Sequence, residues 1–140
     1  MIRLKDMLVL LSKNSAITEI VIMTKSGNRL YQLQNTLGKE VLSINFTRVS
    51  NFAYSCTLTI SFIDIGYSES IEYLRFSDIE KCIGKDTIIL PVDSKYNKSM
   101  IQEACNLTEY YESEVVETLV PIFTKEYMIL QVILSDKLIA

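Results

Sequence analysis

The strictest alternation of side-chain types in the chain runs through residues 53–64, AYSCTLTISFID. One set of alternate positions is apolar or aromatic: Tyr54, Cys56, Leu58, Ile60 and Phe62. The positions between them carry hydroxyl groups: Ser55, Thr57, Thr59 and Ser61. This two-residue period predicts a β-strand with one face on the core and the other in solvent. A row of hydroxyl groups is ordinary on a solvated sheet face, so it predicts no binding role by itself.

Apolar side chains recur at helical spacing in residues 2–13, IRLKDMLVLLSK, which predicts a short amphipathic helix. The next two apolar runs, TEIVIMTK and RLYQL, flank the tripeptide SGN. Gly27 or Asn28 in this tripeptide can adopt the positive φ that a tight turn requires. We therefore expect a β-hairpin over residues 18–34, followed by a strand at residues 40–46, EVLSINF.

A second helix is predicted over residues 77–84, SDIEKCIG. Ser77 is placed to cap its N-terminus, and Glu80 lies three residues later, as in a capping box. Gly84 is placed to end the helix, because glycine readily adopts the conformation found just after a helix C-terminus.

Two further strands complete the predicted fold. Residues 86–92, DTIILPV, contain Pro91, which suits a strand at a sheet edge. Residues 126–134, EYMILQVIL, form an apolar run typical of a strand in the middle of a sheet. Together the elements predict an α+β fold, with a mostly antiparallel sheet of about five to seven strands and two to four helices. The length of 140 residues predicts a single domain, residues 1–140, and we see no internal repeat.

The composition excludes most enzyme classes that have a readable signature. The chain contains no histidine, which removes the commonest general base and a common metal ligand. It has only four glycines and no glycine-rich phosphate loop or nucleophile-elbow motif. We therefore expect a protein without catalytic activity, metal or cofactor.

The first residues imitate a secretory signal, but Asp6 interrupts their apolar run. No stretch approaches the run of about 20 apolar residues that a membrane-spanning helix needs. We therefore expect a protein of the cytosol that does not bind membranes. In that compartment Cys56, Cys82 and Cys105 are expected to be reduced and buried.

The negative charge of the chain is concentrated in one segment. Residues 99–124 contain five glutamates and no lysine or arginine, whereas residues 1–98 have a net charge of +2. Ser99 followed by Gln102 predicts a helix that begins at Met100. On a continuous helix one face would contain Glu103, Tyr110, Glu114 and Glu117. A break near Asn106, with Thr108 capping a second helix, is the alternative.

Two interpretations of this segment remain open. The first is an ordinary solvated helix face that one tyrosine anchors to the core. The second is a partner-binding surface, in which carboxylates stand where nucleic-acid phosphates would and tyrosines anchor the interface. The candidate residues are Glu103, Glu109, Tyr110, Tyr111, Glu112, Glu114 and Glu117. The absence of a basic cluster argues against direct binding of nucleic acid by this protein.

The first half of the chain resembles a group of known sequences. The resemblance rests on LKDMLVLLSKN, EIVIMTKSGNRLYQL, LGKEVLSINF and LTISF, and it covers residues 3–62. These segments are similar to short uncharacterised proteins encoded on prophages and mobile elements of Clostridium-type Gram-positive bacteria. The resemblance implies a phage-like origin, and it implies no site residues.

The acidic segment and the phage-like origin lead to one functional expectation. We expect a non-enzymatic inhibitor of a host defence complex, similar to an anti-CRISPR protein, that acts in the host cytosol. Its partner would be a basic protein or ribonucleoprotein complex of the host. The alternatives are a virion or baseplate subunit, an immunity protein against a basic nuclease toxin, and a binder that sequesters a nucleotide signal.

Overall fold

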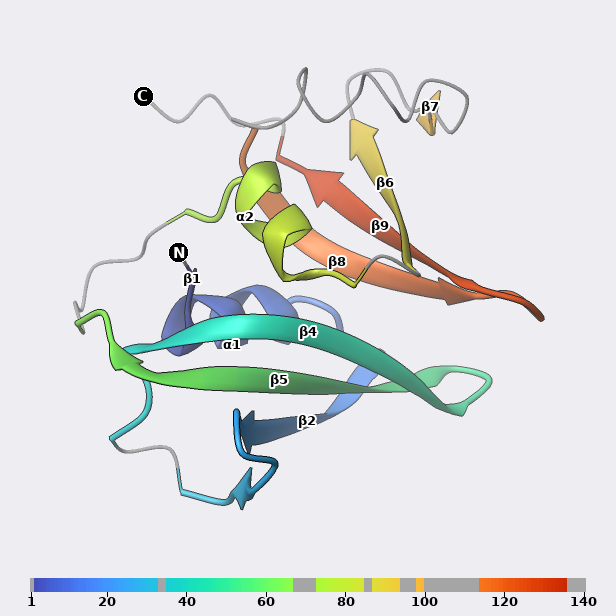
Figure 1. Ribbon diagram of the computed structural model, residues 1–140. Coiled ribbons are helices and arrows are strands. Elements are labelled where there is room, and N and C mark those ends of the chain that lie inside the picture. The colour runs from blue at the N-terminus through green and yellow to red at the C-terminus, as the bar shows by residue number, and fades with distance from the viewer. Residues whose placement is uncertain are drawn as a thin grey trace.

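The computed structural model describes residues 2–32, 35–66, 73–84, 87–93, 98–99 and 114–135. The described residues form two β-sheets and two helices (Figure 1). The first sheet consists of β1 (Ile2–Arg3), β2 (Ile17–Thr24), β3 (Arg29–Leu30), β4 (Lys39–Ser50) and β5 (Ala53–Asp64). The second consists of β6 (Thr87–Asp93), β7 (Lys98–Ser99), β8 (Val116–Phe123) and β9 (Met128–Leu134). The helices are α1 (Leu4–Ser12) and α2 (Phe76–Cys82).

The mixed α+β character of the fold and its mostly antiparallel strand pairing are confirmed, but the expectation of one sheet is wrong. The strands form a five-stranded sheet in the order β1-β4-β5-β2-β3 and a four-stranded sheet in the order β7-β6-β9-β8. In each sheet one pair is parallel, β2 with β5 and β6 with β9, and the other pairs are antiparallel. The sequence could not show this division, because an alternating pattern identifies a strand without identifying its neighbours.

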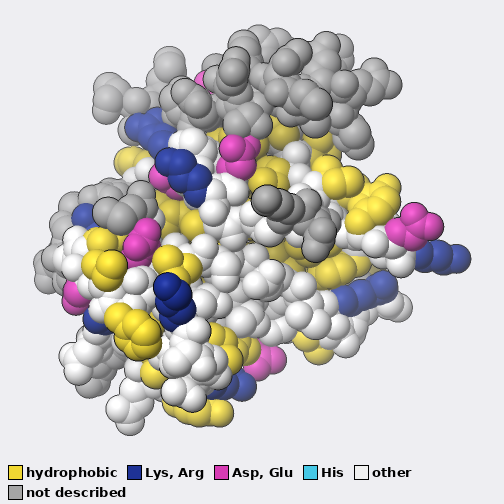
Figure 2. Space-filling model, viewed as in Figure 1, with side chains coloured by type: hydrophobic (Ala, Val, Ile, Leu, Met, Phe, Trp, Pro, Cys, Tyr) yellow, Lys and Arg dark blue, Asp and Glu magenta, His cyan; other side chains and the backbone are white. Residues whose placement is uncertain are grey.

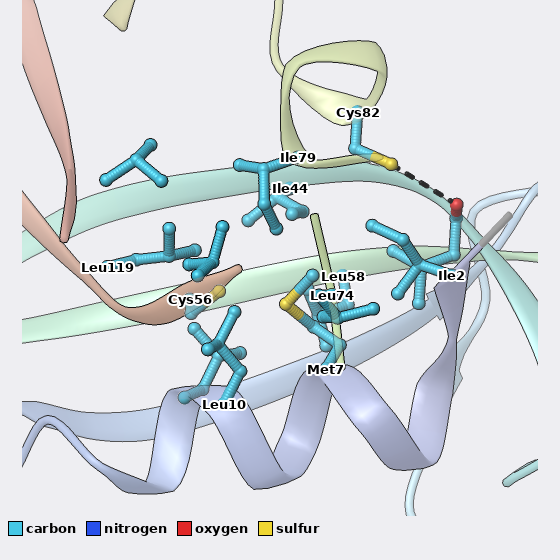
Figure 3. Close-up of a cluster of buried hydrophobic side chains, with 14 of the residues drawn as sticks. Ile2, Met7, Leu10, Ile44, Cys56, Leu58, Leu74, Ile79, Cys82 and Leu119 are labelled. Atoms are coloured by element: carbon cyan, nitrogen blue, oxygen red, sulfur yellow. Dashed lines mark hydrogen bonds between the residues drawn. The ribbon is translucent and has the colours of Figure 1, made fainter. Parts of the chain in front are cut away.

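One hydrophobic core joins the two sheets and both helices. Helix α1 contacts β4 and β8, and α2 contacts β4, so both helices lie against the first sheet and α1 reaches the second. In Figure 3, Met7 and Leu10 of α1 point towards Cys56 and Leu58 of β5. Burial of these side chains holds α1 against the sheet, since a short helix gains most of its stability from packing an apolar face.

Two specific contacts reinforce the junction between the sheets. The Asn14 side chain donates a hydrogen bond from Nδ2 to the carbonyl oxygen of Leu119 in β8, with a distance of 2.9 Å. The rings of Tyr54 in β5 and Phe123 in β8 stack with their centroids 5.4 Å apart. The ring stacking joins the two sheets directly, and the Asn14 hydrogen bond joins the segment between α1 and β2 to the second sheet.

Strand β5 confirms most of the predicted alternation. Cys56, Leu58 and Ile60 are buried, and β5 lies between β4 and β2 in the middle of its sheet. Phe62 was expected in the core and is instead 66% exposed. The register between β4 and β5 shifts beyond Ile60, so the alternation no longer aligns Phe62 with the core face.

Most predicted element positions in the described ranges are confirmed. Helix α1, the β2–β3 hairpin with its positive φ at Gly27, and strands β4, β6 and β9 all lie where the patterns placed them. The edge position expected for β6 from Pro91 is wrong, because β6 lies between β7 and β9. Only Val92 and Asp93, which follow Pro91, pair with β7, so the missing N–H group of Pro91 costs no hydrogen bond to that strand. Ser99 belongs to β7 rather than to a helix cap, and the helix expected from Met100 lies outside the described residues.

The predicted N-cap of the second helix is wrong by two residues. Helix α2 begins at Phe76, and Arg75 is its N-cap. The backbone N–H of Arg75 donates to the Asp78 carboxylate at 2.9 Å, so Asp78 has the role that we expected of Glu80. Arg75 also forms a β-bridge with Val115, and this pairing sets where the extended chain turns into the helix.

Candidate functional site

Five of the seven candidate partner-binding residues lie outside the described residues. They are Glu103, Glu109, Tyr110, Tyr111 and Glu112. Glu114 and Glu117 are described, and both side chains are exposed. The exposure of these two glutamates agrees with the requirement that the charges of the segment be solvated.

The element that contains Glu117 differs from the expected one. Glu114 precedes β8 and Glu117 lies within it, so these two residues do not share a helix face. From Leu119 onward β8 shows the inside–outside alternation of a strand, with Leu119 and Pro121 buried and Ile122 exposed. A register shift between Val116 and Thr118 places the exposed Glu117 in an irregular part of the strand. The β-branched residues of VVETLVPIF favour this extended conformation over the helix that the glutamate spacing suggested.

Glu114 is held beside the start of α2. Its carbonyl oxygen accepts a hydrogen bond of 2.9 Å from the backbone N–H of Phe76. Two residues further on, the N–H of Val116 donates to the carbonyl oxygen of Leu74 at 2.8 Å. These backbone bonds give Glu114 a defined position next to a helix, although its side chain is free to face solvent.

Strand β8 is the terminal strand of its sheet, with β9 on one side. The edge of β8 that faces away from β9 is partly occupied, since the N–H of Val116 donates to the Leu74 carbonyl oxygen and Asn14 donates to the Leu119 carbonyl oxygen. A partner would therefore contact Glu117 through its exposed side chain. The surrounding charges are of both signs, because the exposed Arg75 forms a β-bridge with Val115, the residue that follows Glu114. Figure 2 likewise shows acidic and basic side chains interspersed on the visible face. Among the described residues, the acidic surface is thus the pair Glu114 and Glu117 rather than a broad patch.

Two small clefts lie beside the helices. One, of about 240 Å³, is lined by Ile2, Glu40, Val41, Leu42, Asp78, Lys81 and Cys82. The other, of about 150 Å³, is lined by Asp6, Val9, Leu10, Lys13, Tyr73, Leu74 and Val116. Both are smaller than the clefts that usually enclose a small-molecule ligand, about 300 Å³ or more.

The two described cysteines are suited to packing rather than to chemistry. Cys56 and Cys82 are buried and unpaired with each other. Burial raises the pKa of the Cys56 thiol to about 12 and that of the Cys82 thiol to about 11. Both thiols are therefore protonated at neutral pH, and the Cys82 Sγ donates to the Val41 carbonyl oxygen at 3.5 Å, drawn as a dashed line in Figure 3. Cys105 lies outside the described residues.

The described ranges contain no group of three or more carboxylate, cysteine or histidine side chains placed to bind a metal ion. Neither described helix has the length and apolar character needed to cross a membrane. These two observations concern only the part of the chain that the structure describes.

One exposed feature was missed in the sequence. Phe52, at the turn between β4 and β5, is 87% exposed, and Val49 close by is also exposed. Arg48 donates to the Asn51 side chain at this turn. The signal was the aromatic residue that directly follows Asn51, at a turn position where polar residues are usual.

The chain was compared with known families, curated proteins and solved structures. No family model, no curated protein and no solved structure matches it.

Proposed function

We propose that the protein is a non-catalytic, phage-borne inhibitor of a host defence complex, similar in action to an anti-CRISPR protein. It binds a basic, nucleic-acid-binding partner in the host cytosol through an acidic surface. The observation that supports this proposal most is the charge distribution along the chain: residues 99–124 contain five glutamates and no basic residue. A surface of this kind attracts the basic groove that normally holds phosphates.

The described end of this segment is accessible to such a partner. The side chains of Glu114 and Glu117 are both exposed. Exposed carboxylates contribute little to the stability of the fold, typically tenths of a kcal/mol. Their concentration on one segment is better accounted for by attraction to a partner than by folding.

The absence of catalysis is part of the proposal. The chain has no histidine, and the raised pKa values of Cys56 and Cys82 leave both thiols poor nucleophiles. Inhibition would therefore be stoichiometric, with full effect only when the protein equals or exceeds its target in concentration.

A charge-reversal experiment tests the acidic surface. Purified CRISPR effector complexes are assayed for cleavage of their target DNA at increasing concentrations of the protein. The Glu114→Lys/Glu117→Lys variant should need about tenfold more protein for half-inhibition, because it lacks the field that steers the encounter. The difference should shrink as salt is added, since salt screens exposed charges.

Glu117→Lys alone is compared with Glu126→Lys as a matched control. Both variants replace one exposed glutamate, but Glu117 lies in β8, whereas Glu126 lies in the turn between β8 and β9 and outside the acidic segment. We expect weaker inhibition from Glu117→Lys and unchanged inhibition from Glu126→Lys, with the thermal melting of both as in the unaltered protein. Equal inhibition by all variants at low salt would contradict the proposed surface.

A further inference from the structure

The two sheets repeat one arrangement of elements. A helix and four strands follow one another as α1-β2-β3-β4-β5 in the first half of the chain and as α2-β6-β7-β8-β9 in the second. Within the sheets, the spatial order β4-β5-β2-β3 corresponds to β8-β9-β6-β7. The directions agree as well: β2 is parallel to β5 as β6 is to β9, and the remaining pairs are antiparallel in both.

The correspondence extends to the residues of the long hairpins. The buried pairs of β4 and β5 are Val41–Ile60, Ile44–Leu58 and Phe46–Cys56. The buried pairs of β8 and β9 are Val116–Leu134, Leu119–Val132 and Pro121–Leu130. In each hairpin the register shifts directly after the first of these pairs, between Val41 and Ser43 and between Val116 and Thr118. A shared irregularity is stronger evidence of equivalence than shared regular pairing, because bulges occur at particular positions.

The entry into each helix is also the same. Ile2 pairs with Val41 just before α1, and the Leu74 carbonyl oxygen accepts from the N–H of Val116 just before α2. Arg3 and Arg75 are the two N-caps, both in an extended conformation, and an aspartate follows each three residues later. The sequences around them, IRLKDM and LRFSDI, share this spacing of apolar, arginine and aspartate positions.

The contacts between the halves are reciprocal. Helix α1 packs on β8 of the second half, and α2 packs on β4 of the first. The two clefts beside the helices correspond in the same way. In the larger cleft, Ile2 and Val41 of the first half face α2 of the second half. In the smaller cleft, Leu74 and Val116 of the second half face α1 of the first half. On the helices, Asp78 and Cys82 correspond to Asp6 and Leu10. Such reciprocity is the property of an interface with twofold symmetry.

We infer that the chain is an internal duplication, in which two copies of one α-β-β-β-β unit are related by an approximate twofold rotation. Each unit packs its helix on the first strand of the long hairpin of the other unit, which is β4 in one unit and β8 in the other. The surface formed by the helix and this strand therefore binds a second copy of the same unit. The expectation of no internal repeat is therefore wrong. The repeat is hidden in the sequence because the copies share mainly the spacing of buried positions, and their loops differ in length.

Segment exchange in the full-length chain tests the inference. In one chimera residues 74–93 are replaced by residues 2–24, so that both halves contain the first helix and the parallel strand that follows it. The converse chimera has residues 74–93 in place of residues 2–24. If the units are equivalent, the grafted segment finds the same neighbours, and the chimera unfolds in one cooperative transition within about 15 °C of the unaltered chain. Circular dichroism and NMR dispersion measure this.

The matched control is a chain with the grafted segment in reverse order, which keeps its composition and length but loses the equivalence. We expect this control to lack a cooperative transition. One folded chimera beside an unfolded control supports the duplication. Failure of both chimeras to fold, or a control as stable as the chimeras, overturns it.

Discussion

Leu58→Ala should lower the free energy of unfolding by about 2–5 kcal/mol, the range for truncating a fully buried aliphatic side chain. Leu58 is completely buried in β5, the central strand of the five-stranded sheet. Its strand neighbours are Ile44 in β4 and Ile22 in β2, both buried. The cavity left by the substitution would lie where α1 meets the sheet, and a well-packed region relaxes only partly around such a cavity.

The matched control for Leu58→Ala is Thr59→Ala, one residue along the same strand. Thr59 points to the opposite face of the sheet, away from the core cluster. We expect it to cost about 0.5 kcal/mol or less, as for most substitutions outside the core. Urea unfolding followed by circular dichroism measures both, since the chain has no tryptophan to report by fluorescence. Similar losses at the two positions would contradict the assignment of the two faces.

Gly38→Ala should be the second most damaging of these substitutions. A Cβ atom at Gly38 would lie 2.5 Å from Oδ1 of Asp64 and 3.0 Å from the backbone C and O atoms of Gly66. The Asp64 side chain can move aside, but the Gly66 backbone is fixed in part because its N–H donates to Asp64. The carbonyl oxygen of Gly38 also accepts from the N–H of Ile65. Overpacking of this kind typically costs about 1–3 kcal/mol.

Gly84→Ala is the control for the loss of a glycine as such. No atom lies within 4 Å of a Cβ placed there. Alanine also reduces the freedom of the unfolded chain, so we expect an unfolding free energy that is unchanged or raised by up to about 1 kcal/mol. Urea unfolding compares the two variants. A Gly38→Ala protein as stable as Gly84→Ala would show that the approach of residues 64–66 to Gly38 is looser than described.

Elements whose apolar positions follow a clear pattern were predictable from the sequence. The arrangement of these elements into two sheets was not. The alternation of residues 53–64 and the apolar run of residues 126–134 each identified a central strand. Neither pattern says which strands share a sheet, because hydrogen bonding between strands uses backbone groups that every residue has. The duplication was hidden for a related reason, since Ile44 and Leu119 are equivalent in burial and register without being identical.

The candidate site was predictable in its charge and not in its secondary structure. The exposure of Glu114 and Glu117 follows from the cost of burying unpaired carboxylates. Their predicted placement on a helix face was wrong. The helical spacing of the glutamates was extended into a segment whose pattern of buried and exposed positions fits a strand. The hydrogen bond of Asn14 could not be predicted from the sequence. Its acceptor, the Leu119 carbonyl oxygen, is brought near Asn14 only by the packing of α1 on β8.

The proposed function is tested most directly by the efficiency with which a phage forms plaques on an immune host. Bacterial hosts with different CRISPR–Cas systems, each directed against the phage, are compared with and without the protein. If the account is right, the protein restores plaque formation in at least one immune host towards the level of a non-immune host. The Glu114→Lys/Glu117→Lys variant then restores less, whereas Glu126→Lys restores as much. Plaque formation that stays at the immune level in every host would contradict the account.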